Sequence, residues 1–377
     1  MGCVNSASHF FLYKFMDLKN LFKDKTFIFD SNEGASNDFE IVHEIIKFCK
    51  LGEISSVEFI SANTNYDCYK AIVNDQSYFV KYSLDSSYKG FENESSILST
   101  DEFAWQPTII AHGKLKFGDE IVYSVTSFEY AETANETGRF IITEFLPEFI
   151  ENYFSLQNKN LSRDNVNSFL SRVLSECSVS NLPDEVAEVF KSKNQIETIN
   201  KITEEIKNDI NNFYKPLILE KKELCHGNLN LENILFRDGN FKFVNFTKCF
   251  TSNLYLDVAS LVINFNLNTS TEKLLVKSFS DYQDPNLYQE KLQEYNCCYE
   301  IMIRVKALES LFDLIQESYS LESERPSKIM KIISSFSINS SRFMKIPTFK
   351  KHYEFIYSTI LEPIIGSKDK YEDKKEN

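Results

Sequence analysis

The segment Leu224–Phe246, "LCHGNLNLENILFRDGNFKFVNF", constrains the fold of this chain more than any other stretch. A His-Gly pair lies near its start, and Asn233 follows seven positions after His226. Two short apolar runs then flank an Arg-Asp-Gly sequence, and Asp-Gly between apolar runs is typical of a β-hairpin turn. The segment therefore predicts a polar loop that leads directly into a hairpin.

The length and charge of the chain set the next limits. Its 377 residues suit one large two-lobed unit or two domains. Hydrophobic residues make up 42% and charged residues 25%, as in ordinary globular proteins. The formal net charge of -14 argues against nucleic acid as a partner. It does not argue against ATP, because nucleotide sites use local Lys side chains, backbone N–H groups and metal ions.

The cysteines and the hydropathy pattern indicate in which cellular compartment we expect the protein. The eight cysteines include no Cys-x-x-Cys pair and have no His-rich neighbourhood, which argues against a zinc site. We expect buried thiols in a reducing compartment, and hence a cytoplasmic protein. No apolar run reaches the roughly 20 residues of a membrane-spanning helix, so no transmembrane segment is predicted.

The first residues, "MGCVNS", match the pattern for myristoylation of Gly2, with Cys3 as a candidate for palmitoylation. Two acyl chains hold a protein on a membrane firmly, whereas one chain binds only marginally. The alternative is a chance match, since a start at Met16 would give an equally ordinary N-terminus. We favour the chance match, with acylation at Gly2 and Cys3 as the minor alternative.

Hydrophobic periodicity divides the chain into a strand-rich part and a helical part. A helix is predicted from Asp38 to Gly52, and a second one over "YKGFENESSILST". Strands are predicted for "SSVEFISA", "DCYKAIVN", "SYFVKYSL", "IVYSVTSFEY" and "RFIITEFLPEF". Long amphipathic helices follow after Pro147.

These patterns predict an α+β protein with four parts. Residues 1–38 form an N-terminal extension, and residues 39–146 form a small lobe with an antiparallel sheet. Residues 147–365 form a larger helical lobe that contains the segment Leu224–Phe246. Residues 366–377 are a charged tail that we expect to be disordered.

Two charged residues precede the loop in an order that suits phosphoryl transfer. That chemistry needs a Lys for the nucleotide phosphates, a carboxylate that positions this Lys, a group that orients the acceptor hydroxyl, and metal ligands. Lys81 lies on a predicted strand, and Glu94 lies on the next predicted helix. Taken singly, each would be interpreted as a solvated surface residue. Their order ahead of the loop favours the functional interpretation.

The chain resembles the aminoglycoside phosphotransferase and choline kinase family, relatives of the protein kinases. The family core reads His-Gly-Asp-x-x-x-x-Asn, then a hairpin, then Ile-Asp-Phe or Ile-Asp-Trp, then an Asp-x-Ala helix. Here "HGNLNLEN", "FKFVNF" and "LDVASL" follow that layout. The outline covers residues 39–360, and the motif match covers 222–262. The resemblance implies a two-lobed, protein-kinase-like fold whose N-terminal lobe binds a nucleotide.

The resemblance also implies roles on the nucleotide side of the cleft. Lys81 corresponds to the phosphate-binding Lys, and Glu94 to its partner on the helix. The backbone from Glu144 to Leu146 corresponds to the hinge that meets adenine. One feature departs from the family: "SANTNYDCYKA", at the place of the phosphate-binding loop, contains no Gly.

In the catalytic loop, His226 corresponds to the bracing His, Asn233 to a metal ligand, and Asp257 to the residue that hydrogen-bonds back to the loop. Two positions depart from the family. Asn228 stands in place of the catalytic Asp, and Asn245 stands in place of the principal Mg²⁺-binding Asp. An amide cannot act as a general base, although it can orient a hydroxyl, and it brings no charge to a metal.

Nearby carboxylates offer little compensation for these changes. We expect Asp238 to be a hairpin-turn residue and Glu232 to be a structural or surface residue. The resulting hypothesis is a catalytically impaired kinase-like protein, a pseudokinase, that binds a nucleotide, a metabolite or a protein partner. ATP and Mg²⁺ are the expected cofactors, with binding weakened or lost.

Two alternatives stay open. One is an active ATP-dependent kinase that phosphorylates a hydroxyl of choline, a sugar or an aminoglycoside-like substrate. Its substrate would be a small hydroxyl-bearing or cationic metabolite. The other is a vestigial cleft, with the function on a different surface of the protein.

Overall fold

The structure is a computed structural model. It describes residues 36–62, 66–98, 107–127, 132–133, 141–158, 166–182, 186–188, 190, 195–319, 336–337 and 339–362. The chain forms two compact units: Ala35–Asn181 with Thr203–Lys306, and Met1–Gly34 with Leu182–Ile202 and Ala307–Asn377. The first unit holds both the N-terminal sheet and the segment Leu224–Phe246. The acylation pattern at Gly2 and Cys3 and the charged tail lie outside the described residues.

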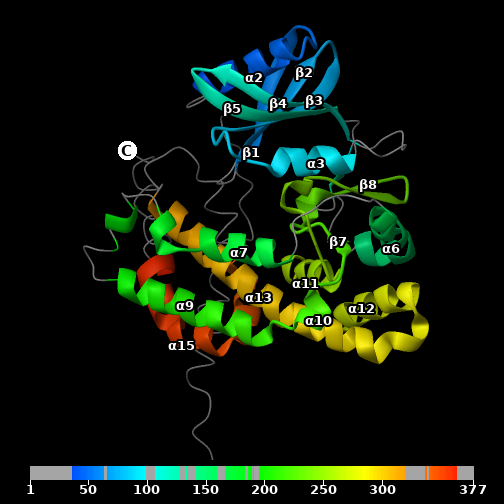
Figure 1. The fold of residues 1–377 in the computed structure, drawn as a ribbon, viewed down its shortest axis with the longest axis vertical. Coiled ribbons are helices and arrows are strands. Elements are labelled where there is room, and N and C mark those ends of the chain that lie inside the picture. Colours follow the sequence, from blue (N-terminus) through cyan, green and yellow to red (C-terminus); the bar gives the residue numbers. More distant parts are fainter. Residues whose placement is uncertain are drawn as a thin grey trace, which may run out of the picture. The chain divides into compact units, whose positions relative to one another are not determined.

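An antiparallel sheet of five strands forms the N-terminal part of the first unit (Figure 1), in the order β1-β2-β3-β5-β4. The strands are β1 Ile54–Ala62, β2 Asp67–Val73, β3 Gln76–Ser83, β4 Thr108–Phe117 and β5 Asp119–Ser127. Four of them confirm predicted strands. The sequence interpretation missed β4, an edge strand whose residues alternate between exposed and half-buried. Such a strand buries too little to give a strong pattern.

Two helices accompany the sheet. In α2, Ser36–Phe48, four apolar residues at helical spacing pack with Tyr69, Val80 and Val125 of the sheet. These four residues are Ile41, Val42, Ile45 and Ile46. In α3, Gly90–Leu98, the predicted helix is confirmed, and Phe91, Glu94 and Leu98 are all buried. The helix α3 packs against η4, Phe246–Lys248, which follows Asn245.

The strand predicted over "RFIITEFLPEF" is wrong. Its described part forms α5, Ile141–Glu144, and the start of α6, Leu146–Ser155. In α6 the residues Leu146, Phe149, Ile150 and Tyr153 are buried, at spacings of one, three and four residues. This helical period extends beyond the short apolar run that resembled a strand.

The predicted hairpin is confirmed. It consists of β8, Ile234–Arg237, and β9, Asn240–Phe243. Asp238 and Gly239 form its turn with φ values of 51° and 77°, as a two-residue type I′ turn requires. The two-residue strand β6, Glu132–Thr133, adds to this hairpin through β8. The strand β7, Glu223–Cys225, pairs with β10, Phe250–Ser252, so the loop between β7 and β8 starts and ends at fixed strands.

Helices make up most of the rest. They are α7 Val166–Glu176, α9 Ile196–Phe213, α10 Pro216–Leu219, α11 Tyr255–Asn264, α12 Thr269–Gln283, α13 Tyr288–Tyr319 and α15 Pro347–Ile356, with a π-helical turn at Tyr357–Leu361. Short 3-10 turns lie at Leu156–Asn158, Val179–Asn181, Leu231–Asn233 and Pro285–Leu287. Nine consecutive residues of α11, from Tyr255 to Ile263, are buried. Within the described ranges, no helix is long and apolar enough to span a membrane.

Candidate functional site

Lys81 and Glu94 meet in a buried ion pair. Lys81 Nζ lies 2.7 Å from Oε1 and 2.9 Å from Oε2 of Glu94. The two residues are 9% and 1% exposed. Burial acts to lower the pKa of Lys81, but the adjacent Glu94 carboxylate outweighs it and raises that pKa above its ordinary value. The structure thus brings together the two charged residues that the sequence singled out.

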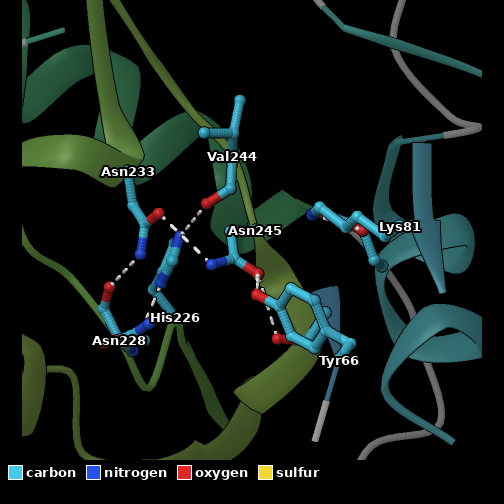
Figure 2. A network of polar contacts seen from close by, with 9 residues as sticks. Tyr66, Lys81, His226, Asn228, Asn233, Val244 and Asn245 are labelled. Carbon is cyan, nitrogen blue, oxygen red and sulfur yellow. Dashed lines mark hydrogen bonds and ion pairs between the residues drawn. The ribbon is translucent and has the colours of Figure 1, made fainter. Parts of the chain in front are cut away.

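His226 links the loop to the end of the hairpin. Its ring is buried, and burial lowers its pKa to about 4, so the ring is neutral near pH 7. The backbone N–H of Asn228 donates to Nδ1 at 3.3 Å, which therefore carries a lone pair. The proton lies on Nε2, which donates to the carbonyl oxygen of Val244 at 2.8 Å (Figure 2). This is the bracing geometry expected for His226.

Asp257, near the start of α11, holds the other side of the loop. Its Oδ2 accepts from the backbone N–H of His226, and from the Tyr153 hydroxyl at 2.8 Å. Its Oδ1 accepts from the backbone N–H of Gly227 at 3.1 Å. Burial raises the pKa of Asp257 to about 6, while the three donors act in the opposite direction. The predicted hydrogen bonding from Asp257 back to the loop is therefore present.

Gly227 is required by this arrangement. Its φ of +76° favours glycine, and a Cβ here would lie 2.2 Å from the carbonyl oxygen of Lys248. The loop and the segment after Asn245 thus lie so close together that only glycine fits at position 227.

The three asparagines of the loop and hairpin form one hydrogen-bonded network (Figure 2). Asn245 Nδ2 donates to Asn233 Oδ1 at 3.3 Å, and Asn233 Nδ2 donates to the backbone oxygen of Asn228 at 2.8 Å. Asn245 Oδ1 accepts from two hydroxyls, Tyr66 at 2.8 Å and Thr247 at 3.0 Å. An amide oxygen has two lone pairs, so both acceptor positions of Asn245 are taken by the protein itself.

Asn230 supports this network from within the loop. Its Oδ1 accepts from the backbone N–H groups of Glu232 and Asn233 at 3.1 and 3.0 Å, which caps the short turn Leu231–Asn233. Its Nδ2 lies 3.4 Å from Oδ1 of Asn228. The side chain of Asn228 therefore contacts a neutral amide.

The residues present do not fit a magnesium site. Mg²⁺ is held by hard oxygen ligands that normally include one or two carboxylates. Asn233 and Asn245 offer only neutral amide oxygens, which already accept hydrogen bonds. In the part of the chain that the structure describes, no group of three or more His, Cys, Asp or Glu side chains could hold a metal. Asp238 is an exposed turn residue 3.5 Å from Arg237, and Glu232 is exposed.

The structure gives no support to a hinge at Glu144–Leu146. Strand β5 ends at Ser127, and Glu132–Thr133 already pairs with β8, so the chain has left the five-stranded sheet before α5 begins. Glu144 is exposed on α5, and Leu146 is buried at the start of α6. Both are helical, not extended. Contact of these two residues with adenine stays a prediction.

Tyr66 belongs to the site and was missed from the sequence. It lies within "SANTNYDCYKA", the segment at the place of the phosphate-binding loop, and directly precedes β2. Its side chain is 8% exposed, and its ring centroid lies 5.7 Å from Lys81 Nζ. The lack of Gly in "SANTNYDCYKA" was the available signal, because side chains then occupy space that such a loop leaves to a ligand.

Comparison with known proteins identifies the fold. Choline kinase LicA from Streptococcus pneumoniae superimposes with a TM-score of 0.53 at 15% identity, over 80% of this chain and 99% of that one. The apo form of a thermostable mutant of aminoglycoside phosphotransferase APH(4)-Ia gives a TM-score of 0.50 at 12% identity, over 79% and 98%. The chain has their protein-kinase-like fold. No protein-family model and no curated protein sequence matches this chain. The kinase-like fold predicted from the loop and hairpin is thus confirmed by structure alone.

Proposed function

We propose that this protein is a catalytically impaired kinase-like protein that acts by binding rather than by phosphoryl transfer. The observation that carries the proposal is the network around Asn245. Its amide oxygen accepts from Tyr66 and Thr247, and its amide nitrogen donates to Asn233. The position that the family resemblance assigns to the cation is thus satisfied by protein groups.

Loss of the cation position would be the larger of two defects. In phosphoryl transfer, metal ions bridge the phosphates and offset the charge that develops in the transition state. An amide pair supplies no negative charge to hold such an ion. Because defects within one catalytic unit are not additive, their costs cannot simply be multiplied.

The second defect concerns the acceptor hydroxyl. The amide of Asn228 cannot take a proton from it at neutral pH. Loss of general-base assistance typically costs about 10²–10⁴ in rate. Phosphoryl transfer depends more on positioning than on proton removal, so this change alone is compatible with slow turnover. Both defects together favour a binding function.

The rest of the framework supports retained binding. The buried pair of Lys81 and Glu94 keeps its geometry, and His226 and Asp257 still brace the loop. A buried ion pair contributes little net stability compared with apolar residues of similar size. Its presence therefore favours a cleft that still takes an anionic ligand. A nucleotide is the first candidate, ahead of other phosphorylated metabolites or a protein partner.

A transfer assay tests this proposal. Purified wild-type protein and the double variant Asn228→Asp with Asn245→Asp are incubated with ATP, Mg²⁺ and choline, a sugar or an aminoglycoside. We expect no transfer by the wild type above the level seen with EDTA. Mg²⁺-dependent phosphorylation of any of these acceptors by the wild type would overturn the proposal and favour an active small-molecule kinase.

A further inference from the structure

The Tyr66 side chain spans from the N-terminal sheet to the turn that contains Asn245 (Figure 2). Its hydroxyl lies 2.8 Å from Asn245 Oδ1, although the two residues are 179 positions apart in the sequence. The face of its ring is turned to Lys81 Nζ, 5.7 Å from the ring centroid. One buried phenol thus contacts the residue at the expected cation position and the residue at the expected phosphate position.

Neighbouring aromatic rings hold the Tyr66 side chain in this place. Its ring centroid lies 5.5 Å from that of Phe91, in an edge-to-face arrangement, and 6.0 Å from that of Tyr88. Phe91 is fully buried on α3, and Tyr88 packs edge-to-face on Phe91 at 5.0 Å. Rotation of the phenol away from Asn245 would disrupt this cluster and lose its favourable aromatic contacts.

The hydroxyl competes directly with a cation for the same oxygen. A Mg²⁺ ligand oxygen lies about 2.0–2.1 Å from the ion, so an ion bound to Asn245 Oδ1 would need one of its lone pairs. Tyr66 and Thr247 use both. We propose that Tyr66 is a specificity-determining residue that excludes divalent cations from the Asn233–Asn245 pair. This inference rests on the proposed function, because it takes position 245 as the former cation site.

Exclusion by Tyr66 acts in addition to the loss of carboxylates. Restoring Asp at 228 and 245 returns negative charge but leaves the phenol in place. Removing the Tyr66 hydroxyl frees a lone pair at 245 but returns no charge. Restored charge alone therefore gives a weakened cation site, both changes together give a stronger one, and the natural cleft takes ligands that bind without a divalent cation.

Binding of Mn²⁺ alone, measured by the electron paramagnetic resonance signal of the free ion, tests this inference. The double variant Asn228→Asp with Asn245→Asp is compared with the triple variant that adds Tyr66→Phe. We expect the triple variant to bind Mn²⁺ about tenfold more tightly, because one hydrogen bond to the ligand oxygen is removed. The single variant Tyr66→Phe, which keeps Asn228 and Asn245, should show no saturable binding of Mn²⁺.

Tyr78→Phe in the double variant is the matched control. Tyr78 is a buried tyrosine of the same sheet whose hydroxyl bonds to Gln76 at 2.7 Å, so its loss should leave the Kd for Mn²⁺ unchanged. If Tyr66→Phe lowers the Tm of the double variant, Tyr66→Leu in that double variant gives a second measurement of the Kd for Mn²⁺ without the hydroxyl. If the double and triple variants bind Mn²⁺ with equal affinity, or if neither binds it, the role of Tyr66 is overturned and the proposed function still stands. Mg²⁺-dependent transfer by the wild type instead overturns the proposed function.

Discussion

Nδ2 of Asn245 donates a hydrogen bond to Oδ1 of Asn233 at 3.3 Å. The two side chains at the positions that the family resemblance assigns to a metal therefore bind each other. A carboxylate at 245 has no donor and would set two acceptors face to face, an arrangement that a cation between them resolves. The amide nitrogen takes over that bridging role without a metal. The amide at 245 thus joins the hairpin end to Asn233 through a direct hydrogen bond.

The buried ion pair makes a prediction about stability. Lys81→Met leaves the Glu94 carboxylate, 1% exposed, without its counter-charge. Breaking such a pair from one side typically costs about 3–5 kcal/mol. We expect a loss of unfolding free energy of that order in urea unfolding, and a smaller loss when Glu94→Leu is added.

An exposed pair in the same sheet is the control. Lys114 Nζ lies 2.8 Å from Glu120 Oε1, a similar distance, but the two side chains are 54% and 53% exposed. Lys114→Met should therefore cost less than about 1 kcal/mol. Equal losses for Lys81→Met and Lys114→Met would show that burial does not determine the energetics of the Lys81–Glu94 pair.

Replacement of Gly227 tests the close approach at the loop. In Gly227→Ala the new Cβ would lie 2.2 Å from the Lys248 carbonyl oxygen, a backbone atom, at a φ of +76°. Gly118→Ala is the matched control, because φ is +69° and no atom lies within 4 Å of the new Cβ. The control should cost about 1–2 kcal/mol from backbone strain alone, and Gly227→Ala clearly more. Equal costs, measured by urea unfolding, would refute the contact.

We expect His226 and Asp257, two buried groups at the loop, to change the unfolding free energy with pH in opposite directions. The pKa of His226 is lowered to about 4, so between that pH and its unfolded pKa near 6.5 the unfolded state binds more protons, and unfolding free energy rises with pH. The pKa of Asp257 is raised to about 6 from 3.8, so in that interval the folded state binds more protons, and unfolding free energy falls with pH. Between pH 4 and 6 the two contributions offset each other.

Removal of His226 separates the two contributions. Between pH 4.5 and 5.5, the unfolding free energy of His226→Asn should fall relative to that of the wild type by roughly 1 kcal/mol per pH unit. Urea unfolding at several pH values measures both slopes. Parallel slopes for the two proteins would contradict a neutral, buried His226 in the folded state.

Local chemistry explains which parts of the site could be predicted. The hairpin after Asn233 follows from Asp238 and Gly239 at two positive-φ positions. The strand of Lys81 and the helix of Glu94 follow from short-range periodicity. Each of these signals lies within one element, so the sequence alone reveals it.

Contacts between distant segments were not predictable in the same way. The hydrogen bond from Tyr66 to Asn245 depends on how α3 and the start of β2 pack on the turn after β9. The segment that forms α5 and the start of α6 was predicted as a strand ending at Phe149, because the buried period of α6 becomes visible only when Ile150 and Tyr153 are included. The edge strand β4 has no fully buried residue, so its sequence lacks the apolar alternation that predicts a strand.

Thermal shift with ATP, in Mg²⁺ and in EDTA, tests the central claim most directly. The wild type and the double variant Asn228→Asp with Asn245→Asp are compared at the same ATP concentration. The loss of the cation site predicts that Mg²⁺ does not raise the Tm of ATP-treated wild type above its value in EDTA, whereas Mg²⁺ raises that of the double variant. A wild-type Tm that rises with ATP only when Mg²⁺ is present would contradict the claim.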